Sequence, residues 1–379
     1  MEWAEMMYFD NSATTLQKPP QVAEAVAAAI NSLGNPGRSF CSPSMDAARV
    51  VLFARMEIAR LVGLKNPMRV AFTANATESL NLVLRSLISP DDGVITSALE
   101  HNSVLRPLYG IGCPLSFIRS DDQGRLILDN LAALLSENTR YVVCTHGSNL
   151  TGSVTDVETL YSFCRQHGLT LILDAAQTMG SVKTDAGMAD IVCFTGHKAL
   201  FGPQGTGGIV AAEYDDFSLV KTGGSGDSSF ERHQSLAMPD IFEAGTHNAH
   251  GLAGLQAGVR FINEKGIAAV MEEERKLTEH FLEGARSIPG VRIYGPDAGV
   301  HETRLPIVAL NIGDLSSEDV SQRLWEGWRI VTRPGSHCAP LAHEFFGTRE
   351  RGMVRFSFSS FTTDGEIDAA IAALHAIAR

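Results

Sequence analysis

Residues 191–198 read Ile-Val-Cys-Phe-Thr-Gly-His-Lys, an apolar run that gives way at once to polar side chains. The glycine-rich segment 202–208 follows closely and lets the chain turn tightly. A short apolar run bounded by turn signals is typical of a strand that is covered on both faces. The stretch therefore predicts a buried strand that delivers Lys198 to its carboxyl end.

Similar apolar runs recur along the chain, separated by helical patterns such as residues 77–88 and 154–167. The candidate strands are residues 69–72, 93–97, 140–145, 170–173, 190–194 and 208–211. Strands that alternate with helices form βαβ units, in which the strands run parallel and helices cover both faces of the sheet. Residues 20–212 are therefore expected to form an α/β domain with a mostly parallel sheet.

The sequence beyond residue 212 has a different character. Residues 222–239 are rich in glycine and serine and predict a long loop. A helical pattern then extends over residues 249–287, with a break or bend near Gly266, and the chain ends in a further helical pattern at residues 363–378. These patterns indicate a C-terminal α+β unit joined to the sheet domain by a long helical segment.

The composition excludes several function classes. The chain has 379 residues, 44% of them apolar and 20% charged, and a formal net charge of -12. Such a chain is globular rather than disordered, and its negative charge repels nucleic acid and anionic membranes. The N-terminal residues 1–10 lack the features of a secretory signal, and no apolar run reaches the length of a membrane span. We therefore expect a cytoplasmic protein that acts on a small molecule.

The cysteines are consistent with a reducing compartment. They stand at positions 41, 113, 144, 164, 193 and 338, and no two of them are spaced like a zinc or redox pair. Cys144, Cys164 and Cys193 lie in apolar runs and are expected to be small core residues. We expect free thiols and no metal site.

Lys198 and Asp174 carry the main chemical prediction. An amine that enters a cleft from a strand end can form an imine with a carbonyl cofactor, although a solvated loop lysine has the same local sequence. Asp174 ends the run 170–173, and a carboxylate at the carboxyl end of a parallel strand faces the crevice where α/β sheets bind ligands. There it can keep a pyridine nitrogen protonated, which makes the ring an electron sink. A helix N-cap is the alternative role of Asp174.

Further polar groups follow other predicted strands. Residues 75–78, Asn-Ala-Thr-Glu, open a helix, so they can bind a phosphate, form a capping box, or do both. His101 could stack on an aromatic ring or be a buried structural residue. Asn149 and Gln177 could bind a ring hydroxyl, although a surface role is equally compatible with Gln177. So many polar groups at successive strand ends favour one shared ligand site.

A second chemical segment lies near the C-terminus. Residues 333–340 read Arg-Pro-Gly-Ser-His-Cys-Ala-Pro, in which the thiol of Cys338 has an adjacent histidine and a nearby arginine. This locally cationic setting favours a nucleophilic thiolate, and an incidental loop cysteine is the alternative. Arg355 interrupts an alternating strand at residues 354–359, where it could hold a carboxylate or face solvent.

These motifs resemble those of the cysteine desulfurases and selenocysteine lyases in the class V aminotransferase superfamily. The similarity runs from Tyr8-Phe9-Asp10-Asn11-Ser12-Ala13-Thr14-Thr15 to the C-terminal helix, and it is most specific at residues 195–198 and 333–339. The resemblance implies the pyridoxal 5′-phosphate (PLP)-dependent transferase fold of type I, with a seven-stranded-type, mostly parallel sheet. It implies a large PLP-binding domain of residues 16–255. Residues 1–15 and 256–379 would form a small α+β domain that carries the Cys338 loop and Arg355.

The resemblance also implies how the cofactor is held. Lys198 would carry PLP as a Schiff base, Asp174 would partner its pyridine nitrogen, and His101 would cover the ring face and take part in catalysis. The other cofactor contacts would come from residues at the ring oxygen and the phosphate: Gln177, Asn149, Ala76, Thr77, Thr195, His197 and, from a second subunit, Thr246.

The implied reaction converts L-cysteine to L-alanine. Arg355 would hold the substrate carboxylate, with Arg333 and Asn149 as secondary candidates, and Lys198 would remove the α-proton. Cys338 would then take the sulfur as a persulfide and pass it to an acceptor protein, in a pathway such as iron–sulfur cluster assembly. The resemblance further implies a homodimer, because the family shares its active site between two subunits.

The sequence departs from the family pattern at three points. Phe40-Cys41 follows Gly37-Arg38-Ser39 where relatives often have Gly-His, and His247 stands where a proline is usual. Thr195 replaces the serine of many relatives but keeps the hydroxyl group. The first two departures bear on the identity of the substrate.

Three alternatives stay open at this point. A selenocysteine lyase is a close variant of the desulfurase, and a class V aminotransferase or lyase could act on another amino acid or a phosphonate-type amine without using the thiol. Cys338 separates that enzyme from a desulfurase, because transamination needs no thiol. A degenerate member that serves as a partner or regulator is the non-enzymatic alternative, and the intact Lys198 and Asp174 argue against it.

Overall fold

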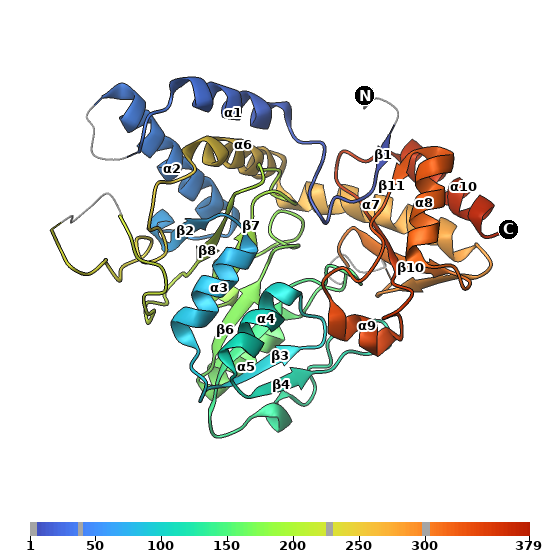
Figure 1. Cartoon of the computed structure of the whole chain (residues 1–379), viewed down its shortest axis with the longest axis horizontal. Helices are drawn as coiled ribbons and strands as arrows, with labels where there is room; N and C mark the ends of the chain where they lie inside the picture. The colour runs from blue at the N-terminus through green and yellow to red at the C-terminus, as the bar shows by residue number, and fades with distance from the viewer. Residues whose placement is uncertain (1–5, 37–40, 225–229, 298–303) are drawn as a thin grey trace.

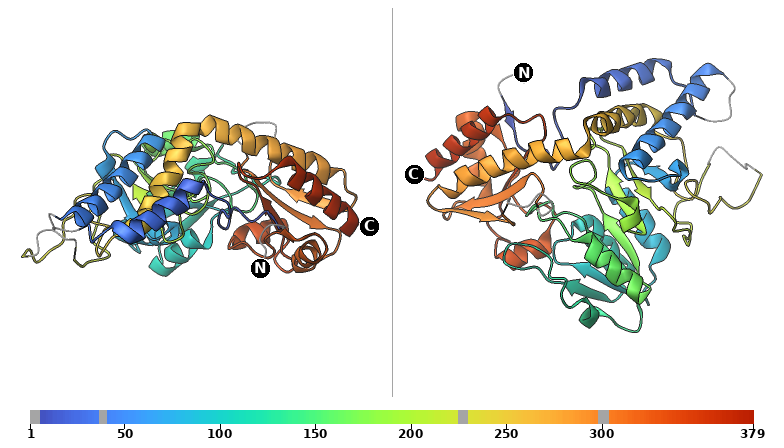
Figure 2. Two further views of the ribbon diagram at one scale, coloured as in Figure 1. Left: turned by 90° about the horizontal axis from the view of Figure 1, so that it is seen from above. Right: turned by 180° about the vertical axis from the view of Figure 1, so that it is seen from behind.

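The computed structural model describes residues 6–36, 41–224, 230–297 and 304–379. A large body is built around a seven-stranded sheet, and a smaller body beside it holds both ends of the described chain (Figure 1). A long helix, α7 (Ile267–Arg286), extends from the large body along the small one (Figure 2).

The large sheet is mostly parallel, as predicted. Its strand order is β2-β8-β7-β6-β5-β3-β4, and β8 alone is antiparallel to its neighbours. The strands are β2 (Val70–Thr73), β3 (Gly93–Ser97), β4 (Leu115–Ile118), β5 (Thr139–Thr145), β6 (Thr170–Asp174), β7 (Ile191–Thr195) and β8 (Gly207–Val210). The six predicted strands are confirmed. The edge strand β4 was not predicted, because three of its four residues are only half-buried and it lacks a continuous apolar run.

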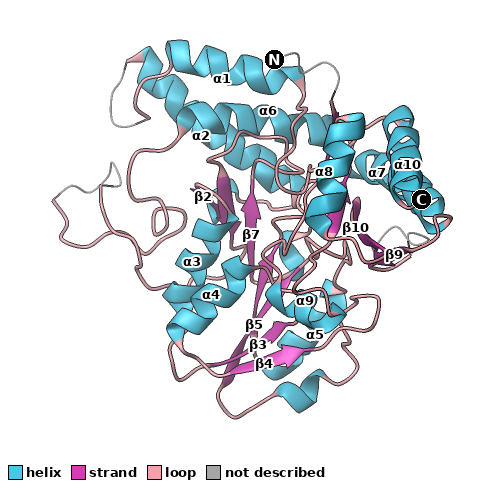
Figure 3. Cartoon of the chain, turned by 45° about the vertical axis from the view of Figure 1, so that its right-hand side comes forward, coloured by secondary structure: helices cyan, strands magenta, loops and turns pink. Residues whose placement is uncertain are grey.

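Helices cover both faces of this sheet (Figure 3). Alternate residues of a strand point to opposite faces: Leu171 and Leu173 pack into the core beneath α2, α5 and α6, and Ile172 packs into the core beneath α3 and α4. This double burial explains why the strands are continuous apolar runs. The helices are α1 (Pro20–Ser32), α2 (Ser42–Leu61), α3 (Ala76–Leu87), α4 (Asn102–Ile111), α5 (Val157–His167) and α6 (Ala249–Lys265).

The small body is α+β, as expected. Its antiparallel sheet has the order β12-β10-β9, and a separate parallel pair joins β1 to β11. Phe9, Phe281 and Phe356 form the centre of its core. Its strands are β1 (Met7–Tyr8), β9 (Val291–Tyr294), β10 (Ile307–Ile312), β11 (Ile330–Val331) and β12 (Val354–Ser357). Besides α7, its helices are α8 (Ser317–Trp328), α9 (Pro340–Phe346) and α10 (Asp364–Ile377).

The predicted helices are confirmed with shifted bounds. The pattern at residues 154–167 becomes a helix only from Val157, because the side chain of Asp156 accepts a hydrogen bond from Thr159 N and caps it. The pattern at residues 249–287 is two helices, α6 and α7, separated at Gly266, whose φ of 84° no other residue type adopts readily.

Two further expectations concern segments between the helices. The described parts of the predicted loop, residues 222–224 and 230–239, form neither helix nor strand. The domain division at residues 15 and 255 stays a proposal, and residue 255 lies within α6. None of the helices in the described residues has both the length and the apolar character needed to cross a bilayer.

Candidate active site

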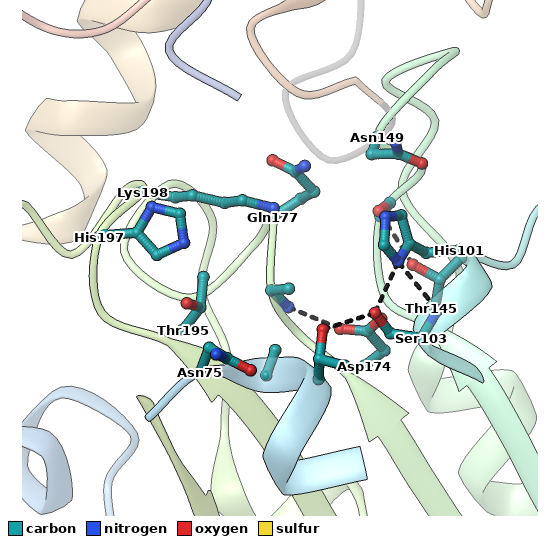
Figure 4. A pocket seen from close by; sticks show the side chains of 14 residues that line it. Asn75, His101, Ser103, Thr145, Asn149, Asp174, Gln177, Thr195, His197 and Lys198 are labelled. Carbon is teal, nitrogen blue, oxygen red and sulfur yellow. Dashed lines mark hydrogen bonds between the residues drawn. The ribbon is translucent and has the colours of Figure 1, made fainter. Parts of the chain in front are cut away.

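A cavity of about 260 Å³ lies at the carboxyl ends of β5, β6 and β7, beside the N-terminus of α3 (Figure 4). Strand ends and helix starts surround it, as expected for an open α/β sheet. The predicted residues that line it come from five separate segments of the chain: Ala76, Thr77, His101, Asn149, Asp174, Gln177, Thr195, His197 and Lys198. The fold thus brings these nine candidates together.

Lys198 and Asp174 share this cavity. Asp174 is 5% exposed at the end of β6, and burial raises the pKa of its carboxyl, against the effects of the Ala176 N–H and of Lys198. Burial lowers the pKa of Lys198 to about 8, although the charge of Asp174 acts in the opposite direction. A lysine with this pKa is partly a neutral amine near pH 7, which is the form that attacks a carbonyl carbon.

Asp174 is not a helix cap. Its Oδ1 accepts a hydrogen bond from Ala176 N at 2.9 Å within a turn, and the segment between β6 and β7 contains only the short 3-10 helix Ala186–Met188. The alternative role considered from the sequence is therefore wrong. The carboxylate faces the cavity instead, as Figure 4 shows.

The part of the cavity formed by the first turn of α3 and the segment after β7 offers hydrogen-bond donors for an anion. Asn75 caps α3 by accepting a hydrogen bond from Glu78 N at 2.9 Å, so capping and an open first turn coexist. Thr77 Oγ1 lies 2.8 Å from Ser103 Oγ. Thr195 Oγ1 and His197 Nδ1 are buried and, within the described chain, have no hydrogen-bond partner. Buried polar atoms are usually paired, and because these two belong to residues that line the cavity, they can bind a polar ligand there.

His101 lies across the cavity from Lys198 (Figure 4). Burial lowers its pKa to about 4, and the charges of Lys198 and Arg355 act in the same direction. Its Nδ1 accepts a hydrogen bond from Ser103 N at 3.0 Å, which places the proton of the neutral ring on Nε2. A neutral imidazole of fixed orientation can cover the face of an aromatic ring.

The side-chain amides of Gln177 and Asn149 each donate one hydrogen bond to a backbone carbonyl. Gln177 Nε2 donates to Ser12 O at 3.2 Å, and Asn149 Nδ2 donates to His337 O at 2.6 Å. Each amide nitrogen carries a second hydrogen, so each can still donate to a ring oxygen in the cavity.

Cys338 does not line the cavity, but its loop is fixed beside it. Cys338 O accepts a hydrogen bond from Asn102 N at 2.8 Å, and the preceding carbonyl is the one bound by Asn149. His337 and Cys338 both have left-handed backbone conformations, with φ of 50° and 54°, and the thiol is exposed. The loop that carries Cys338 is therefore tied by two hydrogen bonds to segments that also line the cavity.

The expected cationic setting of Cys338 needs a correction. His337 is 9% exposed, and burial lowers its pKa to about 3, so this ring is neutral at pH 7. Burial could not be inferred from the local sequence of the loop. The local setting of the thiol is therefore less cationic than the sequence predicts.

Arg355 is buried rather than facing solvent. It is 3% exposed on β12, where NH2 lies 2.8 Å from Asp10 Oδ1 and NH1 donates to Asn149 O at 2.9 Å. Arg333 is more exposed, with NH1 3.8 Å from Asp10 Oδ2. Neither arginine lines the cavity itself.

Thr246 and the family departures lie elsewhere. Thr246 is exposed in the loop before α6 and lines a second hollow together with His247. His247 Nε2 is 3.4 Å from Glu243 Oε2, whose carboxylate is paired with the buried Arg55. Cys41 is an exposed residue at the start of α2. Residues 37–40, including Phe40, lie outside the described chain.

Several cavity residues were not named as site residues from the sequence. Thr145 ends β5, a position that could have indicated it, and Ser103 follows His101 in the first turn of α4. Glu100 lies behind them with no solvent exposure, and burial raises its pKa to about 8. In the described residues, no cluster of His, Cys, Asp and Glu side chains has the arrangement of a metal site.

The donor set matches the functional groups of PLP. The cavity offers an amine for the carbonyl, a carboxyl for the pyridine nitrogen, amides for the ring oxygen and unpaired donors for the phosphate. The observation that decides the fit is the pair of unpartnered atoms, Thr195 Oγ1 and His197 Nδ1.

Comparison with known proteins agrees with this geometry. The family model described as aminotransferase class-V matches residues 7–370. A cysteine desulfurase of Cronobacter sakazakii is 30% identical over 390 residues, which covers 99% of this chain and 94% of that protein. The apo structure of a cysteine desulfurase from Thermococcus onnurineus has a TM-score of 0.91 at 31% identity, with 99% and 95% of the two chains covered. A cysteine desulfurase from Escherichia coli, in an S-sulfonic acid form, gives 0.86 at 25% identity, with 98% and 94% covered.

Proposed function

The chain belongs to the aminotransferase class V family, and from this premise we propose that it is a PLP-dependent cysteine desulfurase. It converts L-cysteine to L-alanine and transfers the sulfur through a persulfide on Cys338. The observation that carries the proposal is the shared cavity of Lys198 and Asp174, with the Cys338 loop hydrogen-bonded to its edge.

The cofactor would be held by residues of the large body. Lys198 is the amine that binds its carbonyl carbon, and the phosphate would lie between the first turn of α3, Thr195 and His197. Asp174 would keep the ring nitrogen protonated. When bound, PLP supplies an electron sink that makes the α-proton of an amino acid acidic.

The protein side chains perform the remaining steps. Arg355 would bind the substrate carboxylate through its Nε–H, which is buried and has no partner among the described residues. Lys198 would remove the α-proton as a neutral amine, and the lowering of its pKa to about 8 makes this form available near neutral pH. His101 would cover the ring and exclude water from that side.

The sulfur step balances without an external oxidant. The Cys338 thiolate attacks the substrate sulfur, an S–S bond forms, and the C–S bond of the substrate breaks. The electron pair of that bond stays with the carbon skeleton, which takes up protons and leaves as L-alanine. The enzyme is left with a persulfide on Cys338.

We also propose the assembly and setting that this activity requires. Thr246 is exposed outside its own cavity, and an apolar stripe on α2 (Met45, Leu52, Phe53 and Met56) is also exposed; both support a homodimer in which Thr246 reaches the partner's phosphate site. Cys113, Cys144, Cys164, Cys193 and Cys338 are thiols, which supports a cytoplasmic location. An acceptor protein, for example in iron–sulfur cluster assembly, would remove the sulfur.

The proposal is tested by sulfur release. PLP-loaded protein incubated with L-cysteine and a thiol reductant is expected to form sulfide and alanine in equal amounts. Cys338→Ser should lose sulfide release by roughly 10²-fold or more while keeping the cofactor absorbance. Cys41→Ser, which removes the other exposed thiol, is the matched control and should behave as wild type. Amino-group transfer that survives in Cys338→Ser would instead identify an aminotransferase.

A further inference from the structure

Asp10 is fixed beside the substrate-binding arginine by the fold of the N-terminal segment. The chain after β1 runs along β12, where Asp10 forms a parallel bridge with Ser357. Ser357 N donates to Phe9 O at 2.7 Å, and Asn11 Nδ2 donates to Ser357 O at 2.9 Å. The residues on both sides of Asp10 are thus tied to the strand that carries Arg355, Phe9 through its backbone and Asn11 through its side chain.

The Asp10 carboxylate engages two arginines. Its Oδ1 is 2.8 Å from Arg355 NH2, and its Oδ2 is 3.8 Å from Arg333 NH1. Arg333 and Arg355 are neighbours across an antiparallel bridge, with backbone hydrogen bonds of 3.1 and 2.8 Å in both directions. Two positive charges therefore face one negative charge, and one positive charge is left over for a ligand.

The contacts of Arg355 also define which of its hydrogens are free. NH2 is engaged by Asp10 and NH1 by Asn149 O, whereas Nε is buried and has no partner in the described part of the chain. A guanidinium that is held at two nitrogens cannot rotate to offer a different edge. Its Nε–H has no partner to lose among the described residues, so it can bind an incoming carboxylate.

The electrostatic influence of Asp10 extends to the cavity. The charge of Arg355 lowers the pKa of Lys198 and that of Asp10 raises it, so the acid offsets the arginine at the reactive amine. Asp10 itself is 7% exposed. A buried arginine without a counter-charge would be strongly destabilised, so Asp10 also keeps Arg355 in place before the substrate arrives.

We propose that Asp10 is the positioning residue that fixes Arg355 for recognition of a single α-carboxylate. The inference rests on the proposed function, in which Arg355 anchors the amino acid substrate. Asp10 does not touch the substrate. It restrains the guanidinium and sets the surplus charge of the site at one, which matches one carboxylate.

The test compares a substrate that has the carboxylate with an analogue that lacks it. Asp10→Asn keeps the volume and one acceptor oxygen but removes the charge. We expect the KM for L-cysteine to rise about tenfold or more while kcat changes less than about threefold. Cysteamine lacks the carboxylate, so its dissociation constant, read from the absorbance of the bound cofactor, should be the same in the variant and in wild type.

Two further variants make the result decisive. Asp46→Asn is the matched control, because Asp46 is an exposed acid paired with Arg49 on α2 and should leave both constants unchanged. If Asp10→Asn does not fold, Asp10→Glu keeps the charge but displaces it by one methylene, and the same selective rise in the KM for L-cysteine is expected.

The failure of this inference can be told from failure of the proposed function. An unchanged KM in Asp10→Asn, or an equal weakening of cysteamine binding, overturns the role of Asp10. An unchanged KM in Arg355→Lys as well overturns the carboxylate anchor, and the inference with it. A wild-type protein that does not use L-cysteine overturns the proposed function itself.

Discussion

The cofactor side and the substrate side of the active site are prepared in different ways. On the cofactor side, Thr195 Oγ1 and His197 Nδ1 are buried and have no hydrogen-bond partner among the described residues, and burial lowers the pKa of Lys198, which favours the neutral amine. On the substrate side, Arg355 is already held by Asp10 and the Cys338 loop by Asn149. The cofactor side lowers the stability of the folded protein until a ligand pairs its buried polar groups. The substrate side is held in place by contacts within the protein.

This difference indicates which part of the molecule is stabilised by cofactor binding. Unpaired buried donors lose the hydrogen bonds that water would give them, and a bound phosphate restores those bonds. The substrate side gains nothing comparable from the cofactor, because Arg355 NH1, Arg355 NH2 and the His337 carbonyl are already paired by the protein. Arg355 Nε has no partner among the described residues, and the substrate carboxylate rather than the cofactor would supply one. Loading with PLP should therefore stabilise the large body most, while the substrate anchors are ready in advance.

The largest effect on turnover is expected from Asp174, the acid that would partner the ring nitrogen of the cofactor. Asp174→Asn cannot keep the ring nitrogen protonated, so turnover of L-cysteine should fall by roughly 10²-fold or more. Cofactor absorbance should remain, because Lys198 and the phosphate donors are intact. Steady-state kinetics and absorbance spectra check both expectations, and Asp156→Asn at the cap of α5 serves as the control. Normal turnover in Asp174→Asn would contradict the role of Asp174 on the cofactor side.

The second prediction concerns Lys198 and the free energy of unfolding of the cofactor-free protein. Below pH 8, Lys198 is charged in the folded and the unfolded protein, and the burial of that charge is fully unfavourable. Between pH 8 and the ordinary value of 10.5, the folded protein loses this proton first and the cost disappears. Cofactor-free Lys198→Met should therefore be more stable than wild type at pH 7 by up to about 3 kcal/mol, and nearly equal to it near pH 10.5.

Denaturant unfolding at the two pH values measures this difference. Lys183→Met, at an exposed position, is the control and should show no such pH-dependent gain. A Lys198→Met protein that is less stable than wild type at pH 7 would show that the cofactor side is satisfied without a ligand.

The smallest effect, on the affinity for PLP, should come from removing the hydroxyl group of Thr195. Thr195→Val removes a phosphate donor, so the affinity for PLP should fall about tenfold. The cofactor-free protein should keep its melting temperature or gain slightly, because Thr195 Oγ1 is a buried hydroxyl with no partner to lose in the described chain. Fluorescence titration with PLP and thermal unfolding are the two measurements. A clear loss of stability without the cofactor would contradict the unpaired state of the hydroxyl.

Much of the cofactor side could be predicted from the sequence, because parallel strands place their carboxyl ends at one edge of the sheet. Asp174 and Lys198 each directly follow an apolar run, and this local pattern is sufficient to bring them together. The edge strand β4 escaped prediction because an edge strand is less buried and its pattern is weaker.

The substrate side was harder to predict because its contacts join distant segments. Asp10 and Arg355 are 345 positions apart, and no local pattern links them. The neutral state of His337 depends on burial by the folded chain, which the residues around it do not reveal. Arg355 and Cys338 could therefore be identified from the sequence, but the contacts that hold them in place could not.

The central claim, that Lys198 binds the cofactor in the cavity above Asp174, can be tested by reductive labelling. The protein is loaded with PLP, reduced with borohydride, digested, and analysed by peptide mass spectrometry. A phosphopyridoxyl group on Lys198, with loss of the imine absorbance, is the predicted result. A label on another lysine such as Lys18, or no label after PLP is supplied, would contradict the account.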